Sequence, residues 1–316
     1  MKSILFKTLI VFITFFLTPF AWAGQKIPAH PEALVDSKWI IEHADDENVV
    51  LLDGSDKKDD TYVNKTVKGA LCLSYRELRK PSGMMKGVTY GMEEETFDKS
   101  PLEEIFRQAG VNRESTVVVV GQHRIDDAAL VFWTLKWLGH KDVRLLPVNY
   151  LEVLPQERLS SELKDLSDVD REGNFQVQAD WTWYATREDT VWAMQSPETG
   201  IWDVRSRSYF QGNKTKTIRG GTLATAKNWF FKKAWTNDSM GKLDWDSVAS
   251  NLKKRFGRAD RQETTVISFC NSGHIGSIGF LAWQCGFDWA LCDSSWNMLA
   301  YDGSLPVKNI QFHIKP

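Results

Sequence analysis

Cysteine is scarce in this sequence, and its few copies lack metal-binding spacing. The 316 residues include four cysteines and no Cys-x-x-Cys pair. So few cysteines in so long a chain exclude a small disulfide-stapled fold, and the missing ligand pattern argues against structural zinc. An excess of positive charge is also missing, because 39 Lys and Arg oppose 41 Asp and Glu. Neither nucleic acid nor an anionic membrane surface is therefore an expected partner.

Long apolar runs are missing after the start of the chain. Residues 1–23 have a basic beginning, an apolar run over 9–17 and Ala-Trp-Ala before Gly24, which is typical of a cleavable signal peptide. The alternative, an uncleaved membrane anchor, is disfavoured because the run is too short to span roughly 30 Å of hydrocarbon. We therefore predict a periplasmic location, with no membrane attachment of residues 24–316 after cleavage.

The rest of the sequence alternates predicted strands with predicted helices. In the first half, strands are expected over 49–52, 116–120 and 143–146, and helices over 37–43, 101–109 and 126–138. In the second half, strands are expected over 200–203, 265–269 and 289–293, and helices over 186–194, 245–256 and 275–285. Such alternation predicts an α/β fold in which each half is a parallel sheet with helices on both faces.

The two halves follow the same order of elements, which predicts an internal duplication. Each has a strand ending in Asp, a Gly turn before an apolar segment, a helix, an apolar strand and a helix ending in Gly. A polar, charged stretch over 155–173 separates them and is typical of an exposed linker. The predicted organisation is a signal peptide over 1–23, a first domain over 24–155, a linker over 156–175 and a second domain over 176–316.

The clearest candidate for chemistry is Cys270, in the segment VISFCNSGHIG over 266–276. A predicted buried strand runs into this cysteine, and a tight turn through Gly273 opens the next predicted helix. Main-chain N–H groups without helical partners surround a thiol at such a junction, and the helix dipole adds positive potential. We therefore expect a lowered pKa and a nucleophilic thiolate. The alternative is an inert cysteine at the end of a core strand.

Several ordered segments resemble the tandem-domain rhodaneses, which are thiosulfate and 3-mercaptopyruvate sulfurtransferases. In the first half they are FRQAGVNRESTVVVV and AALVFWTLKWLGHKDVRLL, and in the second WDVR, IRGG, VISFCNSGHIG and CDSSWNMLAYDGSLPV. The resemblance covers nearly all of residues 24–316 and implies two rhodanese-like domains. It implies that Cys270 forms a persulfide. It also implies that the neighbouring loop holds the substrate through Asn271, Ser272, Gly273, His274 and Ile275.

The resemblance assigns three further roles, each beside a structural alternative. Arg205, in WDVR, corresponds to the arginine that binds the anionic part of the donor, but it could instead pair with Asp203. Trp296 either walls the pocket or belongs to the core. His274 either stabilises the thiolate or a bound oxyanion, or faces solvent at the start of a helix. Cys72 lies in an apolar segment and is expected to be a core residue.

Departures from the family pattern leave the sulfur donor open. The loop CNSGH lacks the basic pair of thiosulfate-selective loops and is not the CGSGVT of mercaptopyruvate enzymes, although Ser272 and Gly273 lean toward the latter. It most resembles the loops of exported tandem rhodaneses. Tyr209 and Thr217 stand where the family has an arginine or acidic residue and a histidine. The corresponding loop of the first half, 121–125, contains no cysteine, so the first domain is predicted to be non-catalytic.

The predicted activity is transfer of a sulfane sulfur from thiosulfate or 3-mercaptopyruvate to cyanide or a thiol. No metal or organic cofactor is expected, because the Cys270 thiolate carries the sulfur; a reductant or sulfur-acceptor protein is a further candidate partner. A cysteine phosphatase is disfavoured, since it needs an arginine where this chain has Gly276. The remaining alternative is a non-catalytic binding or sulfur-sensing module, which the missing loop cations suggest.

Overall fold

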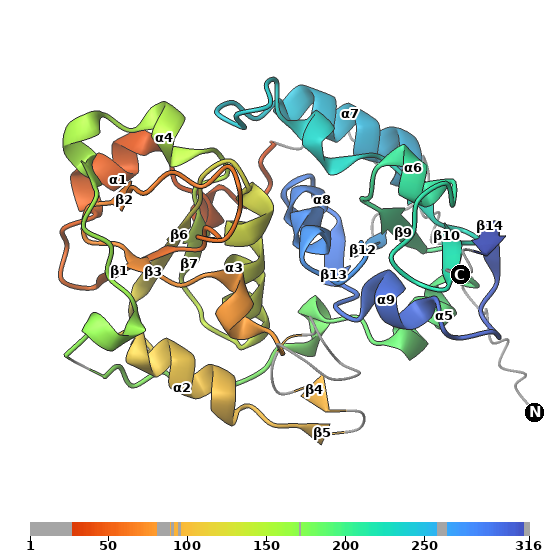
Figure 1. The fold of residues 1–316 in the computed structure, drawn as a ribbon, viewed down its shortest axis with the longest axis horizontal. Coiled ribbons are helices and arrows are strands. Elements are labelled where there is room, and N and C mark those ends of the chain that lie inside the picture. The colour runs from red at the N-terminus through yellow and green to blue at the C-terminus, as the bar shows by residue number, and fades with distance from the viewer. Residues whose placement is uncertain are drawn as a thin grey trace, which may run out of the picture.

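Two four-stranded sheets lie side by side, with helices around and between them (Figure 1). This computed structural model describes residues 27–80, 89, 92–93, 96–170, 172–257 and 264–312, and the predicted signal peptide over 1–23 lies outside them. No helix in these ranges combines the length and the apolar character that crossing a membrane requires.

The first sheet has the order β3-β1-β6-β7, with all strands parallel. In that order the strands cover Leu71–Cys72, Val49–Asp53, Thr116–Val120 and Val143–Leu145. The apolar side chains of β1 and β6 point alternately to the two faces, so both faces need cover. One face packs against α1 (Ser37–His43) and α4 (Tyr150–Val153), and the other against α2 (Ser100–Gln108) and α3 (Ile125–Trp137).

The second sheet repeats this arrangement with the order β11-β9-β12-β13, again all parallel. In that order the strands cover Lys227–Asn228, Thr199–Asp203, Thr265–Phe269 and Asp288–Leu291. One face packs against α5 (Arg187–Ala193) and α9 (Ser295–Leu299), and the other against α7 (Trp245–Phe256) and α8 (Phe280–Gln284). The predicted α/β class, with a parallel sheet and helices on both faces in each half, is confirmed.

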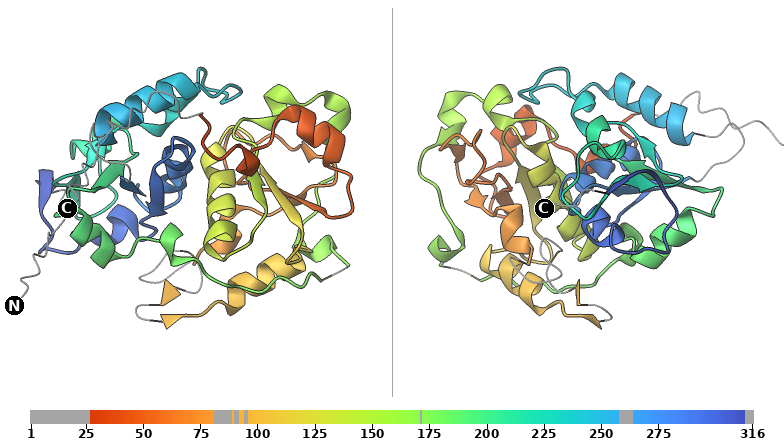
Figure 2. Two further views of the ribbon diagram at one scale, coloured as in Figure 1. Left: turned by 180° about the vertical axis from the view of Figure 1, so that it is seen from behind. Right: turned by 45° about the vertical axis from the view of Figure 1, so that its right-hand side comes forward.

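Helix α3 is buried on nearly every side, because it lies between the two halves (Figure 2). It packs on the first sheet and against the 3₁₀ helix Ile275–Gly279 of the second half, and one core cluster contains side chains from both halves. An all-round apolar helix is the pattern expected of such a position. Trp133 and Trp137 of this helix are fully buried, and Trp283 of α8 is half-buried.

The helix predicted over 275–285 is divided into the 3₁₀ helix Ile275–Gly279 and α8. Two glycines allow this segment to lie directly on β13. A Cβ on Gly276 would come within 2.5 Å of Leu291, and one on Gly279 within 1.9 Å of the Trp289 Nε1. Glycine is needed for this close approach, and it weakens a regular helix at the same place.

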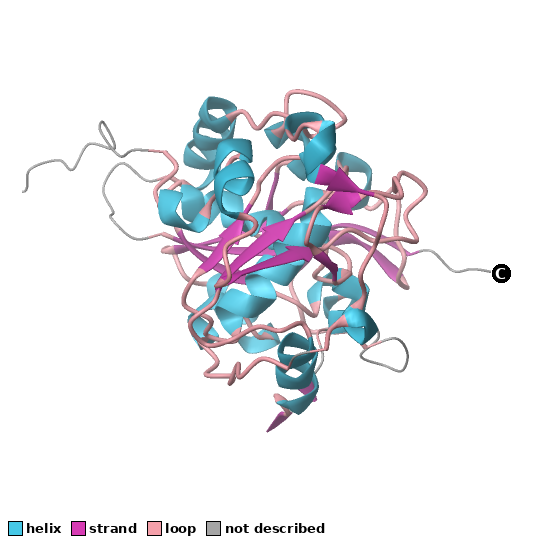
Figure 3. Cartoon of the chain, turned by 90° about the vertical axis from the view of Figure 1, so that its left-hand side faces the viewer, coloured by secondary structure: helices cyan, strands magenta, loops and turns pink. Residues whose placement is uncertain are grey.

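Three two-stranded ribbons complete the described strands. They are β10 (Arg219–Leu223) with β14 (Val307–Phe312), β2 (Thr66–Val67) with β8 (Leu159–Ser160), and β4 (Met92–Glu93) with β5 (Thr96–Phe97). β8 lies in the predicted linker and pairs with the first half. Part of this segment therefore runs along the first half, and the domain boundaries stay a prediction. The view in Figure 3 shows strands as a central layer with helices above and below. The short helix α6 (Arg207–Phe210) follows β9.

Candidate active site between the two halves

Cys270 follows directly after β12, with its backbone fixed by the start of α9. Its N–H donates to the Ser295 Oγ at 3.1 Å, and its carbonyl accepts from the Trp296 N–H at 3.1 Å. Ser295 has a φ of 50°, in the left-handed region that non-glycine residues seldom occupy. This backbone conformation and the bond to Cys270 occur together, and strained residues of this kind cluster at functional sites.

The loop after Cys270 directs main-chain amides at its sulfur. The N–H groups of Ser272, Gly276 and Ile275 donate toward the thiol and favour its ionised form. Gly273 makes the turn with a φ of +82°, and a Cβ there would come within 2.3 Å of the Asp293 carbonyl oxygen. The predicted ring of amides is therefore present, and only glycine fits at its tightest point.

The expectation of a lowered pKa for Cys270 is wrong. The residue is only 2% exposed, and this burial raises the pKa of its thiol more than the amides and the charge of Arg79 lower it. The local loop predicts the amides, whereas the burial of Cys270 depends on the packing of the core cluster around it. Burial and the amide cradle therefore act on the pKa of the Cys270 thiol in opposite directions.

Arg205 is buried, and most of its hydrogen bonds are to acceptors in its own half. Its guanidinium binds both carboxylate oxygens of Asp203, at 2.9 and 2.7 Å, and donates to the Gly221 carbonyl at 2.7 Å. It reaches the loop through one long contact of 3.4 Å to the Asn271 Oδ1. The geometry is that of a buried ion pair that supports the loop from behind.

Trp296 lies beneath this arginine, with the Arg205 guanidinium 5.1 Å from its ring centroid. The indole is fully buried and donates to the Arg219 carbonyl at 2.9 Å. Of its two predicted roles, the contacts are those of a core residue.

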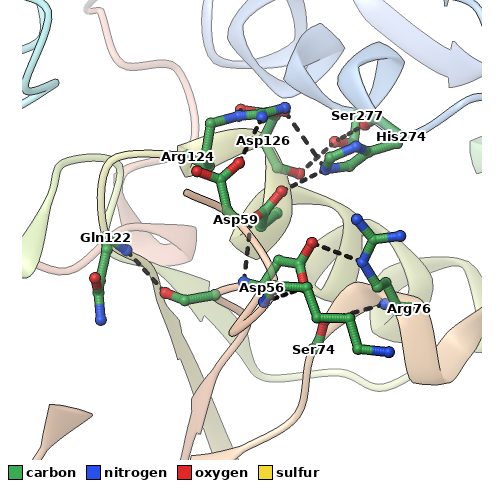
Figure 4. A network of polar contacts seen from close by, with 12 residues as sticks. Asp56, Asp59, Ser74, Arg76, Gln122, Arg124, Asp126, His274 and Ser277 are labelled. Carbon is green, nitrogen blue, oxygen red and sulfur yellow. Dashed lines mark hydrogen bonds and ion pairs between the residues drawn. The ribbon is translucent and has the colours of Figure 1, made fainter. Parts of the chain in front are cut away.

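His274 turns away from solvent toward the first half. Its Nε2 lies 2.6 Å from the Asp127 Oδ1 and 3.4 Å from the Asp126 Oδ2, and its ring stacks on Tyr75 at 3.8 Å between centroids. Ser277 strengthens this docking by donating to the Asp126 carbonyl at 3.1 Å (Figure 4). The predicted roles of His274 were to stabilise the thiolate or a bound oxyanion, or to face solvent, and none of them describes this contact with the first half.

The two aspartates are tuned in opposite directions. Burial alone works against ionisation of Asp126, but the charges of His274 and Arg124 outweigh it and lower its pKa. For Asp127 burial dominates and raises the pKa, despite its contact with His274. Asp126 is therefore the firmer anion of the pair. The difference comes from Arg124, which binds the Asp126 carboxylate at 3.1 and 2.6 Å.

Arg79 is a residue of this site that was not predicted, because no motif in the sequence distinguishes it. It lies in the first half, yet its Nη2 donates to the Ser272 carbonyl and, at 2.7 Å, to the Asp293 Oδ1. Thr89 donates its N–H to the other oxygen of Asp293 at 2.8 Å. Arg79 and Asp293 are both buried, and the guanidinium charge acts on Cys270 to lower its pKa. The first half thus supplies the cation that the loop itself lacks.

A pocket of about 900 Å³ opens beside the loop. Ser272 is the only one of the predicted site residues among its described lining, and Cys270 lies behind it. The remaining described wall comes from the first half and the predicted linker: Asp56, Lys57, Lys58, Ser74, Tyr75, Arg76, Glu77, Arg79, Lys80, Asp165, Leu166 and Ser167.

Comparison with known proteins bears on both halves. The Rhodanese-like domain family matches residues 36–150. "Sulfur carrier protein TtuD" of Thermus thermophilus is 28% identical over 228 residues, which is 68% of this chain and 75% of that protein. The "Thiosulfate sulfurtransferase" of Corynebacterium glutamicum is 25% identical over 302 residues, 87% of each chain. Residues 36–150 form a rhodanese-like domain, and over most of its length the chain is similar to rhodanese sulfurtransferases.

Solved structures share the fold of this rhodanese. The anaerobic ergothioneine biosynthesis enzyme from Chlorobium limicola, in complex with trimethyl histidine, aligns with a TM-score of 0.73 at 14% identity, over 91% of this chain and 72% of that one. SseA from Escherichia coli, a 3-mercaptopyruvate sulfotransferase, aligns with a TM-score of 0.66 at 19% identity, over 84% and 98% of the two chains. At these identities the likeness describes architecture alone.

The other cysteines of this rhodanese are buried and free of disulfides. Burial raises the pKa of Cys72 and that of Cys285 to about 12. Cys292, one residue beyond β13, also has a raised pKa because of burial. None of these three thiols is contacted by a set of main-chain amides like the one around Cys270.

Asp126, Asp127 and His274 are close enough for a metal ion, with one ligand atom of each within 4.8 Å of the others. Arg124 already engages both oxygens of Asp126, and His274 can balance Asp127. Ion pairing accounts for this cluster, so we assign no metal to it.

Proposed function

We propose that this rhodanese moves a sulfane sulfur from thiosulfate or 3-mercaptopyruvate to a thiophilic acceptor, cyanide or a thiol, through a persulfide on Cys270. The observation that carries the proposal is the amide cradle of Ser272, Ile275 and Gly276 around one sulfur atom. Inward-facing amides stabilise a negative charge, which a core cysteine does not need but a thiolate or persulfide does.

The first half-reaction begins with loss of the Cys270 proton to solvent. The thiolate then attacks the outer sulfur of thiosulfate, the sulfur–sulfur bond of the donor breaks, and sulfite leaves with the electron pair. With 3-mercaptopyruvate, the carbon–sulfur bond breaks instead, and the departing enolate takes a proton to become pyruvate. The product in both cases is an anionic persulfide on Cys270, held by the loop amides and by the charge of Arg79.

In the second half-reaction, cyanide or a thiolate attacks the outer sulfur. The persulfide bond breaks, and its electron pair returns to the Cys270 sulfur as thiolate. No external oxidant or reductant is required, because the electron pair of each broken bond leaves with the departing group and the acceptor supplies the pair for the new bond. The amides that stabilise the persulfide also stabilise this leaving thiolate.

Substrate entry requires movement, because Cys270 is 2% exposed. Arg79 and His274 hold the loop against the first half in this structure. We propose that donor binding at the Ser272 side of the pocket separates these contacts. The thiol then loses its burial while it keeps its amides, so its pKa falls when the donor is present.

Export is a further part of the proposal. Residues 1–23 would direct the chain to the periplasm and be removed before Gly24, and a periplasmic reductant or sulfur-acceptor protein would keep Cys270 reduced. Expression of the full chain, followed by fractionation and intact mass measurement, tests this. A periplasmic protein that begins at Gly24 is expected, and a cytoplasmic protein that retains Met1 contradicts export.

Intact mass spectrometry tests the sulfur chemistry directly. The reduced protein, treated with thiosulfate or with 3-mercaptopyruvate, should gain the mass of one sulfur atom, located on Cys270 by peptide mapping. Cyanide should remove it and yield thiocyanate. Cys285→Ser is the matched control, because it changes another buried cysteine of the same half.

The alternative of a non-catalytic binding or sulfur-sensing module is favoured by one observation, the burial that raises the pKa of Cys270. It predicts no persulfide with any donor, although Cys270 remains reduced and becomes reactive to alkylation after unfolding. That result would replace the enzymatic proposal with the binding module.

A further inference from the structure

A serine interrupts the buried strand that leads to Cys270. Ser268 lies in β12 between Ile267 and Phe269 and is fully buried. A hydroxyl in such a position needs a partner inside the protein, because an unpaired buried polar group destabilises the fold. The role of this serine is therefore to be found in the groups that its hydroxyl contacts.

The Ser268 hydroxyl is the middle member of a chain of two buried hydrogen bonds. The Trp289 Nε1–H donates to the Ser268 Oγ at 2.8 Å, and the Ser268 hydroxyl donates to the Gly276 carbonyl at 2.7 Å. Trp289 lies in β13, which pairs with β12, and is 4% exposed. The chain ties the 3₁₀ helix Ile275–Gly279 to two strands of the second sheet.

Gly276, whose carbonyl is held in this way, also faces the sulfur. Its N–H donates toward Cys270, as does that of Ile275. Gly276 lies directly on the end of β12, since a Cβ on it would come within 3.4 Å of the Phe269 Cα and 3.6 Å of the Cys270 N. The carbonyl and the N–H of Gly276 flank one Cα with two soft dihedral angles between them, so fixing the carbonyl restricts the direction of the N–H.

The first half has the same two strand positions without the hydrogen bonds. By strand register, Val119 of β6 is the counterpart of Ser268, and Val143 of β7 is the counterpart of Trp289. Both valines are buried and apolar. The helix that follows β6 is α3, a regular α-helix, where the second half has the 3₁₀ helix. The serine and the tryptophan thus occur together in the half that contains Cys270.

We propose that Ser268 is a positioning residue: its hydroxyl holds the Gly276 carbonyl, so that the adjoining amides of the 3₁₀ helix stay aimed at the Cys270 sulfur. Trp289 orients this hydroxyl, because its N–H occupies a lone pair of the Ser268 oxygen and leaves the Ser268 proton for the carbonyl. The use of the amides in sulfur transfer rests on the proposed function, whereas their effect on the Cys270 thiol does not.

The pH dependence of Cys270 alkylation tests this role without any sulfur donor. The rate of reaction with iodoacetamide is measured against pH, and peptide mapping assigns it to Cys270. Ser268→Ala removes the hydroxyl, so the amides lose their alignment and the midpoint of the profile should rise by about 1 pH unit. An unchanged midpoint in the folded variant overturns the inference.

A pair of variants of similar shape separates the hydroxyl from packing. Threonine and valine differ in that only threonine has a hydroxyl. Ser268→Thr should keep the wild-type alkylation midpoint, whereas Ser268→Val, which copies the first half, should raise it as Ser268→Ala does. Equal shifts in the two variants would show that crowding moves the midpoint, and would contradict the assignment.

Two variants at other positions complete the comparison. Trp289→Phe leaves the serine in place but removes the N–H that orients it, so the alkylation midpoint should rise by less than in Ser268→Ala; no rise contradicts the chain of hydrogen bonds, also where the Ser268 variants do not fold. Val119→Ala is the matched control, since it alters the corresponding buried position of the first half. It should lower the thermal midpoint and leave the alkylation profile unchanged.

Turnover connects the alignment with the proposed function. With thiosulfate and cyanide, Ser268→Ala should lower kcat about tenfold and change the donor KM by less than about twofold, since the amides act on the thiolate and the persulfide. If no persulfide forms in any protein but the alkylation midpoint rises as expected, the proposed function fails and the positioning role survives. If wild type and Ser268→Ala share one kcat and one alkylation midpoint, the positioning role alone fails.

Discussion

The loops that follow β6 and β12 occupy equivalent places in the two sheets and are completed differently. Gly121 stands where Cys270 does: its carbonyl accepts from the Tyr150 N–H at 3.2 Å, as that of Cys270 accepts from Trp296. In the first loop the Gln122 amide donates to the carbonyls of Val63 and Lys65 and to the Tyr150 hydroxyl. A neutral side chain therefore occupies that end of the first sheet, where the second sheet has the Cys270 thiol and its amides.

The buried aspartates beside these loops show the same contrast. Asp53 and Asp203 each accept a threonine hydroxyl at 2.8 Å, from Thr66 and Thr222. Asp53 is then completed by the neutral Tyr150 hydroxyl at 2.7 Å, whereas Asp203 is completed by the Arg205 guanidinium. One frame thus supports a closed, neutral loop in the first half and a charged, anion-directed loop in the second.

The largest expected effect separates the two loops by chemistry. Cys270→Ser should reduce thiocyanate formation at least 1,000-fold, roughly to background, because the serine hydroxyl cannot carry a sulfane sulfur under these conditions. The thermal midpoint should change little, since the substitution is nearly isosteric. Cys285→Ser should retain activity. Substantial turnover by the Cys270 variant would remove this cysteine from the mechanism.

Removing the cation donated by the first half should have the next largest effect. Arg79→Gln should lower kcat/KM about 100-fold and shift the pH dependence of Cys270 alkylation to higher pH, because the Arg79 charge lowers the pKa of that thiol.

Stability must be separated from this electrostatic effect, since Arg79→Gln leaves Asp293 buried without its cation. The double variant Arg79→Gln, Asp293→Asn removes that penalty, and Arg79→Lys keeps the charge with poorer geometry. An unshifted alkylation profile in a folded double variant would show that Arg79 only holds the domains together.

The charged partner of Asp203 and the neutral partner of Asp53 should contribute differently to stability. Arg205→Met leaves Asp203 buried and unpaired and should cost about 3–5 kcal/mol in urea unfolding. Tyr150→Phe removes a neutral hydroxyl from Asp53 and should cost about 1–2 kcal/mol. Equal losses would mean that Arg205 is less important to the frame than its contacts indicate, and a raised donor KM with little loss of stability would favour its predicted role in donor binding.

The neighbouring aspartates should respond to acid with opposite signs. The pKa of Asp126 is lowered in the folded protein, so its ionisation stabilises the fold at neutral pH, and this contribution is lost as pH falls through the lowered pKa. Asp126→Asn should therefore cost about 3 kcal/mol at pH 7, and the difference from wild type should shrink in acid.

The pKa of Asp127 is raised, so its protonation stabilises the fold at low pH, and this contribution is lost as pH rises through the raised pKa. Asp127→Asn should therefore be neutral or stabilising at pH 7, with the difference fading toward pH 4. Urea unfolding at several pH values measures both variants, and the same sign for both would refute the assignment.

The smallest effect is expected from giving the first loop a cysteine. A Cβ on Gly121 would lie 2.9 Å from the Ala128 Cβ, so Gly121→Cys should cost about 1–3 kcal/mol through local crowding. No persulfide should form on it, because Gln122 fills the space beside it. A persulfide at position 121 in the background Cys270→Ser would show that the frame alone suffices.

The central strands could be predicted from sequence because a strand that is buried on both faces has a short run of apolar residues. The predictions over 116–120 and 265–269 match β6 and β12, and the helix over 245–256 matches α7. The helix over 275–285 could not be resolved into two parts, since its form depends on glycines packed against β13.

The amide cradle around Cys270 was also predictable, but the wider environment of this cysteine was not. A strand-to-turn cysteine identifies the amide cradle, which is local in the chain. The Arg79 contact and the Asp126–His274 docking join residues at least 148 positions apart in the sequence. Charged residues such as Arg79 look like ordinary surface side chains until two domains meet.

Helix α3 has a consequence for how this protein can change over generations. Its side chains pack in one core with residues of both halves. They cover one face of the first sheet and also contact the 3₁₀ helix that follows the Cys270 loop. If the two halves were made as separate chains, the apolar side chains of α3 would be exposed in one product, and the surface that they cover would be exposed in the other. Substitutions among the buried side chains of α3 would therefore act on the loop after Cys270 through the 3₁₀ helix Ile275–Gly279.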